Sequence, residues 1–343
     1  MTAHPTSGGR LHEHVITSAA LRGNPLGDPA ERPLWVYTPP GYREDVRYPV
    51  VYVIQGYSGT ISMWHNRTAF RPTFPERIDL LFSGPGADPA LVVLVDAWTA
   101  YGGSQYLDSV ATGNYHTYLC ADVVSWVDGN YSTIADRDAR AITGKSSGGY
   151  GAMVTAMLRP DVFGALATHA GDALFDTTYA SVFPRLARRL RDDFDGSYDA
   201  FLTSFRTSPV PLLHELDELL IEVYGYAAAY SPGSDGRPRV PFDPATGRLV
   251  PDVWATWLER DPVRMAATHG EALRSLRGLW IDAGRRDEFY LDLGASAFHQ
   301  AVLAAGVHPD RIHFELFDGT HAGIEYRYPT AIAWLLRRLR PAS

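Results

Sequence analysis

Gly144-Lys145-Ser146-Ser147-Gly148 lies between a short, partly β-branched segment at 139–143 and a segment at 149–158 that opens on small residues and then becomes apolar. The first segment has the composition of a buried strand and the second that of a helix. A G-x-S-x-G pentapeptide at such a turn is typical of a nucleophile elbow, which exposes the serine hydroxyl. Its glycines permit a tight turn and let the strand and the helix pass close together. We therefore predict that Ser146 is a catalytic nucleophile.

Apolar runs and helical patterns alternate on both sides of this elbow. The runs at 49–54 and 91–95 are apolar on both faces, as expected for strands covered by helices on each side. This alternation predicts an α/β fold with a mostly parallel, doubly wound sheet. The predicted strands are 34–38, 49–54, 91–95, 139–143, 164–168, 278–282 and 312–316, and the predicted helices are 118–127, 289–305 and 329–339.

One long segment interrupts the alternation. Between Gly171 and Glu271 no run reads as a central strand, whereas helical patterns occur and a Pro/Gly-rich span follows at 231–247. Segments of this length usually carry structure of their own or serve the function. We expect a core formed by 1–171 and 271–343, with an inserted, mainly helical cap at 172–270. The helices expected in the cap are 181–191, 198–205, 211–224 and 252–258.

Composition and charge limit the partners and the cellular setting that are expected for this chain. The chain has 343 residues, of which 45% are apolar and 20% charged, and a net charge of −8, which argues against nucleic acid or an anionic membrane as the main partner. Cys120 is the only cysteine, so no intrachain disulfide and no cysteine cluster for a metal is expected. Met1–Gly9 has no secretory-signal pattern, and no apolar run reaches the roughly 20 residues of a membrane span. We expect a cytoplasmic protein that needs no cofactor or metal.

A serine nucleophile requires a base and an acid that orients the base. In this type of site the order along the chain is serine, acid, histidine. His321 lies in the loop directly after the last predicted strand, and Asp287 lies just beyond the strand that ends near Asp282. We predict His321 as the base and Asp287 as the acid, with Asp282 and Glu288 as alternative acids.

The oxyanion of an acyl-transfer intermediate requires two backbone N–H donors. One belongs to the residue after the nucleophile, Ser147, and the other to the turn after the strand at 49–54, where Tyr57 is the expected donor. Aromatic and polar residues near strand ends are expected to line the substrate pocket. These are Gln55, Gly56, Trp64, Trp98, His169 and Asp172.

Several motifs occur in order along the chain, at 37–42, 48–56, 95–98, 108–109, 113–119, 159–165, 284–287 and 319–321. Together they resemble the putative-esterase group of α/β-hydrolases, which includes enterochelin esterases, feruloyl esterases, S-formylglutathione hydrolase and mycolyltransferases. The resemblance implies an α/β-hydrolase fold, the triad Ser146, Asp287 and His321, and Tyr57 and Ser147 as oxyanion donors. Two features depart from the group: many members have His-Gly at the position of Gln55-Gly56, and the shorter members lack the long cap.

These observations lead to one main functional expectation. The chain is expected to be a serine carboxylic-ester hydrolase that forms an acyl-enzyme with a bulky aryl, alkyl or lactone ester, with a small molecule as its partner. An acyltransferase, or a thioesterase that forms or opens macrolactones, would use the same triad and stays open, as does a homo-oligomer. A catalytically inactive ligand-binding protein of the same fold is the alternative from another class. A metal-dependent hydrolase is not favoured, because no H-E-x-x-H pattern occurs.

Overall fold

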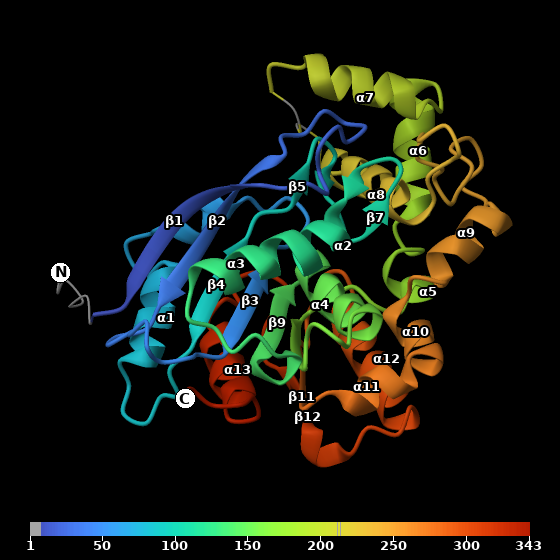
Figure 1. Cartoon of the computed structure of the whole chain (residues 1–343). Coiled ribbons are helices and arrows are strands. Elements are labelled where there is room, and N and C mark those ends of the chain that lie inside the picture. Colours follow the sequence, from blue (N-terminus) through green and yellow to red (C-terminus); the bar gives the residue numbers. More distant parts are fainter. Residues whose placement is uncertain (1–7, 211, 213) are drawn as a thin grey trace.

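The computed structural model describes residues 8–210, 212 and 214–343. Most of the N-terminal stretch without a signal pattern, and parts of the helix expected at 211–224, therefore lie outside the described residues. The centre of the molecule is an eight-stranded sheet with the strand order β1-β2-β4-β3-β9-β10-β11-β12 (Figure 1). Its strands are β1 Arg10–Thr17, β2 Glu31–Thr38, β3 Val50–Ile54, β4 Leu91–Val95, β9 Arg140–Lys145, β10 Ala165–His169, β11 Gly278–Gly284 and β12 Ile312–Phe317.

The six strands from β4 to β12 in this order are parallel, whereas β1 pairs antiparallel with β2 and β2 pairs antiparallel with β4. The predicted doubly wound α/β fold is therefore confirmed. Every predicted strand is present, with its ends within a few residues of the expected ones. The sequence reading missed β1, because this edge strand is mostly exposed and lacks a regular apolar alternation.

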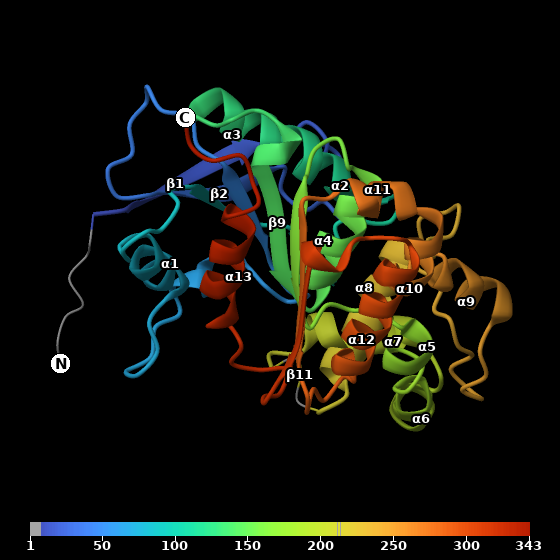
Figure 2. The ribbon, with the colours of Figure 1, turned by 90° about the horizontal axis from the view of Figure 1, so that it is seen from below.

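Helices cover both faces of the sheet, because the central strands are buried on both sides. In β3, Val50, Tyr52 and Ile54 belong to one core cluster, while Val51 and Val53 belong to the other. Helices α1 (Phe74–Phe82) and α13 (Arg327–Leu336) supply side chains to the second cluster. The first face carries, among others, α3 (Val124–Asn130), α4 (Ser147–Leu158) and α12 (Leu291–Ala304), so the two helical layers lie on opposite sides of the sheet (Figure 2).

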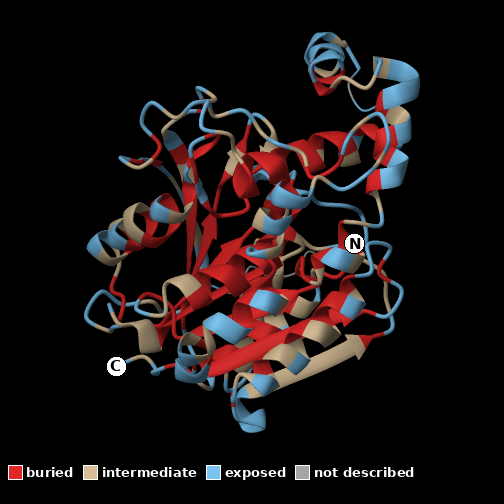
Figure 3. Ribbon diagram, turned by 90° about the vertical axis from the view of Figure 1, so that its right-hand side faces the viewer, coloured by how far each residue is buried: buried red, intermediate tan, exposed pale blue. Residues whose placement is uncertain are grey.

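Helices also make up the segment between β10 and β11. Helices α6 to α9 lie toward one end of the molecule (Figure 1). Figure 3 shows exposed outer surfaces on the helices and buried central strands, whereas the edge strand β12 is mostly of intermediate exposure. Helix α10 packs against α4 and α12 of the core. The expected division into a core and a cap at 172–270 thus stays a prediction. The helices are α5 Phe175–Thr178, α6 Phe183–Phe194, α7 Tyr198–Thr207, α8 Asp217–Tyr230, α9 Pro251–Leu258, α10 Pro262–Thr268 and α11 Gly270–Ser275.

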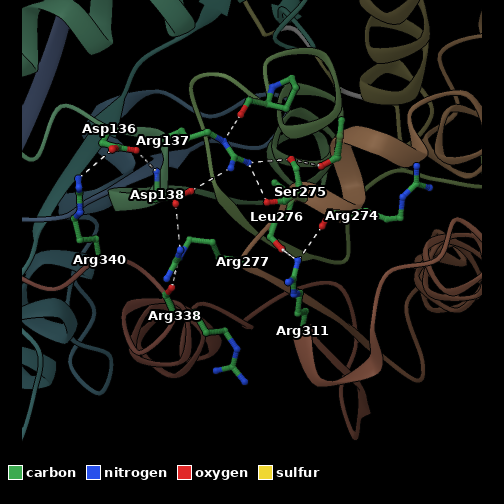
Figure 4. A network of polar contacts seen from close by, with 12 residues as sticks. Asp136, Arg137, Asp138, Arg274, Ser275, Leu276, Arg277, Arg311, Arg338 and Arg340 are labelled. Carbon is green, nitrogen blue, oxygen red and sulfur yellow. Dashed lines mark hydrogen bonds and ion pairs between the residues drawn. The ribbon is translucent and has the colours of Figure 1, made fainter.

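Arginine side chains tie loops together at the amino end of the parallel strands (Figure 4). Arg137, just before β9, donates to the carbonyl oxygen and the hydroxyl of Ser275 at 3.2 and 3.0 Å. Arg277, just before β11, lies 3.1 Å from a carboxylate oxygen of Asp138. These contacts fix the starts of two strands whose opposite, carboxyl ends carry the predicted site. Within the described residues, no helix is both long and apolar enough to cross a lipid bilayer.

Candidate active site

Ser146 occupies the sharp turn between β9 and α4. Its backbone has φ 58° and ψ −127°, a conformation that costs a non-glycine residue free energy and persists only where the surroundings enforce it. The Ser146 N–H donates to the carbonyl oxygens of His169 and Ala170 at 3.0 and 3.1 Å, and its own carbonyl accepts from the N–H of Tyr150 at 2.9 Å. These bonds hold the serine in the strained turn.

The glycines of the elbow are required by close packing. A Cβ atom on Gly144 would lie 2.4 Å from the backbone of Gly148. A Cβ atom on Gly148 would lie 2.6 Å from the carbonyl oxygen of Ile54 in the neighbouring strand. Both distances are below any real contact of a Cβ atom, and the opposing atoms are backbone atoms that side-chain rotation cannot move. The sequence G-x-S-x-G therefore follows from the approach of strand and helix.

His321 and Asp287 come together from the loops after β12 and β11. The imidazole Nδ1 of His321 lies 2.8 Å from Oδ2 of Asp287. The other carboxylate oxygen accepts backbone N–H bonds from Phe289 at 2.9 Å and Leu291 at 3.4 Å. The Asp287 side chain is fully buried and that of His321 is 15% exposed. Because an ionised carboxylate only accepts, Nδ1 carries the shared proton and Nε2 is the nitrogen left for a reacting group.

The two alternative acids occupy other places. Asp282 lies 2.7 Å from Nδ1 of His169 and 2.9 Å from Nε of Arg327, and all of its side chain is buried. Glu288 accepts the backbone N–H of His321 at 2.8 Å. Of the three carboxylates, Asp287 is the one that bonds to the imidazole of His321.

A cavity of about 440 Å³ lies above the carboxyl ends of the strands, and both Ser146 and His321 line it. The described residues include no hydrogen bond between the Ser146 hydroxyl and the imidazole; such bonds are often long before a substrate is bound. Of the residues predicted for the substrate pocket, Gln55, Gly56, Trp64 and Asp172 line this cavity, and so does Tyr57, the predicted oxyanion donor.

Trp98 and His169 do not line this cavity. The guanidinium of Arg32 lies over the Trp98 ring at 4.8 Å. His169 is fully buried with Asp282, and its ring lies 4.6 Å from that of Tyr328 in α13. Side chains alternate between the two faces along a strand, so His169 lies on the same face of the sheet as Ala167. This is the face that α13 covers, opposite to α4.

The N–H groups of Tyr57 and Ser147 have no acceptor in the described part of the chain. Ser147 is the first residue of α4, where N–H groups lack partners within the helix and the helix dipole favours negative charge. A Cβ atom on Gly56 would lie 3.6 Å from Cβ of Ser146, so the turn that carries Tyr57 runs beside the nucleophile. The Tyr57 hydroxyl donates to the carbonyl of Ile221 in α8 at 2.9 Å, which anchors this residue.

Acidic residues on α8 form a wall of the cavity that the sequence reading did not assign. Glu218, Glu222 and Tyr226 line it, and the Tyr226 hydroxyl donates to Glu222 at 2.5 Å. Burial, together with the negative charges of Asp172 and Glu218, raises the pKa of Glu222 to about 8 against the opposing hydrogen bond from Tyr226. The sequence does contain a sign of this wall, because a spacing of four residues places these side chains on one face of a helix.

Asp172 lies at the base of this wall. Its carboxylate accepts from the hydroxyls of Tyr179 at 2.8 Å and Ser147 at 3.1 Å. Burial raises the pKa of Asp172 and lowers that of Lys145, which also lines the cavity. In the part of the chain that the structure describes, no group of three or more His, Cys, Asp or Glu side chains is arranged to hold a metal ion.

Comparisons with known proteins point to one family. The model of the family described as Putative esterase matches residues 29–322. Esterase Rv1288 of Mycobacterium tuberculosis strain H37Rv is 32% identical over 140 residues, which are 40% of this chain. Esterase MT1326 of strain CDC 1551 gives the same values. The matched segment spans only 28% of the length of each relative.

Solved structures show the same fold over nearly the whole chain. A ferulic acid esterase has a TM-score of 0.60 at 19% identity, covering 97% of this chain and 99% of its own. An S-formylglutathione hydrolase from Agrobacterium tumefaciens has a TM-score of 0.55 at 17% identity, covering 99% of both chains. At identities this low the likeness concerns the fold alone, which is that of the α/β-hydrolases.

Proposed function

Because this chain belongs to the Putative esterase family and has the α/β-hydrolase fold, we propose that it hydrolyses carboxylic esters through an acyl-enzyme on Ser146. The observation that carries the proposal is the bond of 2.8 Å between Asp287 and the His321 imidazole, beside a cavity that Ser146 also lines. Position along the chain agrees with it, since the order serine, acid, histidine is that of α/β-hydrolases.

In this mechanism the Nε2 atom of His321 takes the hydroxyl proton as Ser146 attacks the ester carbonyl. The carboxylate of Asp287 keeps the proton of the imidazole on Nδ1 and stabilises the imidazolium that forms. The same imidazolium then gives its proton to the leaving alcohol. The buried position of Asp287 supports this role, because burial strengthens its electrostatic interaction with His321.

The oxyanion would be bound by the N–H groups of Tyr57 and Ser147. Their lack of acceptors among the described residues supports this assignment, as does the N-terminal position of Ser147 in α4. Water activated by His321 would then attack the acyl-enzyme and release the acid. Acyl transfer to another alcohol or amine would use the same residues, and partition of the acyl-enzyme between water and added nucleophiles separates the two reactions.

A bulky ester fits the size and the lining of the cavity. Its volume of about 440 Å³ exceeds the needs of an acetyl group, and aromatic rings such as Trp64, Tyr179 and Tyr226 form much of its surface. Helix α8 belongs to the segment 172–270 and contributes one wall, which supports the assignment of this segment as a cap over the site.

Replacement of the nucleophile tests the proposal. Ser146→Ala should abolish turnover of p-nitrophenyl esters while the thermal melting transition stays close to that of the unmodified protein. Ser234→Ala is the matched control, because Ser234 is exposed and does not line this cavity. Undiminished turnover in Ser146→Ala would refute the assignment of the nucleophile.

A further inference from the structure

The cavity beside Ser146 is lined by more acidic than basic side chains. One lysine, Lys145, and the imidazole of His321 are its basic groups. Its acidic groups are Asp172, Glu215, Glu218, Glu222 and Glu325. This imbalance distinguishes the cavity from an apolar pocket that is made only for an aryl or alkyl group.

The carboxylates on α8 lead from solvent toward the nucleophile. Glu218 is exposed, Glu222 is half-buried and Tyr226 is buried, and their spacing of four residues places them on one helix face. The Tyr226 hydroxyl lies 3.2 Å from the hydroxyl of Ser147, the residue that follows the nucleophile. The acidic face of α8 therefore ends directly beside the elbow.

Ion pairs do not compensate the carboxylates of Asp172, Glu218 and Glu222 within the described residues. Within the described residues, neither Asp172, Glu218 nor Glu222 forms an ion pair, whereas the outer Glu215 pairs with Arg185 at 3.3 Å. Burial lowers the pKa of Lys145, against the opposing charges of Glu325, Asp287 and Glu288. A carboxylate withdrawn from water without a positive partner is unfavourable, and the raised pKa of Glu222 is the result. A bound cation would restore the ionised form.

Unpaired polar atoms at the same cavity are an independent sign of a ligand. Gln55 is only 3% exposed, and both its amide oxygen and its amide nitrogen are buried without a hydrogen-bond partner in the described structure. The indole N–H of Trp64 is buried and unpaired in the same way. Both side chains line the cavity. Buried polar groups are nearly always paired, so these two side chains bring unused hydrogen-bonding capacity to the edge of the cavity.

Tyrosine hydroxyls donate to two of the acidic groups, that of Tyr179 to Asp172 and that of Tyr226 to Glu222. The ring of Tyr226 lies 4.9 Å from that of Tyr179 and 5.1 Å from that of Tyr57, and all three line the cavity. The faces of aromatic rings attract cations, and rings combined with carboxylates are the arrangement that recognises organic ammonium groups. We propose that the ester turned over at this site carries an organic ammonium group, which binds between the acidic face of α8 and these tyrosine rings. This inference rests on the proposed esterase function.

Two pairs of esters that differ only in charge test the inference. In the first pair the alcohol is choline or its carbon isostere, in which a tert-butyl group replaces the trimethylammonium group. In the second pair the acyl group of a phenyl ester ends in trimethylammonium or in tert-butyl. We expect kcat/KM to be higher by roughly tenfold or more for the cationic member of at least one pair. Equal kcat/KM values within both pairs, or higher values for the neutral esters, would overturn the inference. Hydrolysis of the neutral esters would still support the esterase proposal in that case.

A charge-removing variant locates the effect. Glu222→Gln keeps an acceptor for the Tyr226 hydroxyl and should lower, by roughly tenfold, the ratio of kcat/KM for the preferred cationic ester to kcat/KM for its neutral isostere. Glu259→Gln is the matched control, because Glu259 is exposed just after the end of α9 and does not line the cavity. Loss of both activities to the same extent in Glu222→Gln would contradict a role in binding charge.

A second readout needs no turnover. Choline should slow labelling of the intact protein by a fluorophosphonate at concentrations where its neutral carbon isostere does not. If none of the four esters is hydrolysed, the esterase proposal fails for these substrates, and the labelling competition alone decides the inference. Equal effects of the two alcohols, or no effect of either, would then overturn it.

Discussion

The replacement Asp287→Asn removes a single charge from the centre of the candidate site and leaves its shape unchanged. In the native protein one carboxylate oxygen accepts the N–H of Phe289 at 2.9 Å, and the other lies 2.8 Å from Nδ1 of His321. An asparagine has only one acceptor oxygen. If this oxygen serves Phe289, the amide NH2 group faces His321, so Nδ1 must become an acceptor and the proton moves to Nε2. In that tautomer the imidazole cannot take a proton from Ser146.

The size of the effect follows from these contacts. Turning the amide to restore the productive tautomer leaves the buried N–H of Phe289 unpaired, at a cost of about 1–3 kcal/mol. The charge-assisted bond that stabilises the imidazolium is also lost, and such bonds contribute about 1.5–3 kcal/mol. Together these losses predict that kcat falls roughly a hundred- to ten-thousand-fold.

Steady-state hydrolysis of p-nitrophenyl esters measures this fall, and urea denaturation of the same preparation reports whether the fold is retained. Asp318→Asn is the matched control, because Asp318 is exposed and pairs with Arg286 in the neighbouring loop. It should change kcat little. A folded Asp287→Asn protein with a kcat near that of the native protein would refute the role given to Asp287.

Two further replacements test the elbow and the acidic wall. Gly148→Ala should lower the free energy of unfolding by about 1–3 kcal/mol or more, because the added carbon meets backbone atoms at 2.6 and 2.7 Å. Gly129→Ala is the control: no atom lies within 4 Å of its added carbon, so it should stabilise its helix by up to about 1 kcal/mol. Equal effects of the two replacements in urea denaturation would contradict the packing argument. Because the pKa of Glu222 is raised to about 8 in the folded state, the native protein loses stability as the pH rises from the pKa of the unfolded chain, about 4.3, to about 8. Glu222→Gln should remove this loss, so that its gain in melting temperature over the native protein grows with pH across that range, and a gain that does not vary with pH would disprove the assignment.

Much of the fold could be predicted from the sequence because the central strands are buried on both faces. Such strands appear as continuous apolar runs, and all seven predicted strands are present. The strand β1 lacks this signal, since it lies at the edge of the sheet and most of its side chains reach solvent. Its pairing with β2 depends on backbone hydrogen bonds, which leave no apolar pattern in the sequence.

Parts of the site could be predicted for a different reason. Asp287 and His321 follow the ends of adjacent parallel strands, so their positions along the chain imply that they meet. His169 also ends a strand, but its side chain points to the opposite face of the sheet. Residues two positions apart in a strand lie on the same face, so His169 shares the face of Ala167. The acidic wall formed by Glu218 and Glu222 depends on how α8 is rotated and docked, and nothing local to those residues specifies the docking.

The most direct test of the central claim is the mass of the intact protein after reaction with a fluorophosphonate, followed by peptide mapping of the adduct. A serine nucleophile at the elbow predicts one covalent adduct on Ser146 and none in Ser146→Ala. An adduct on any other residue, or no adduct on the folded native protein, would contradict it.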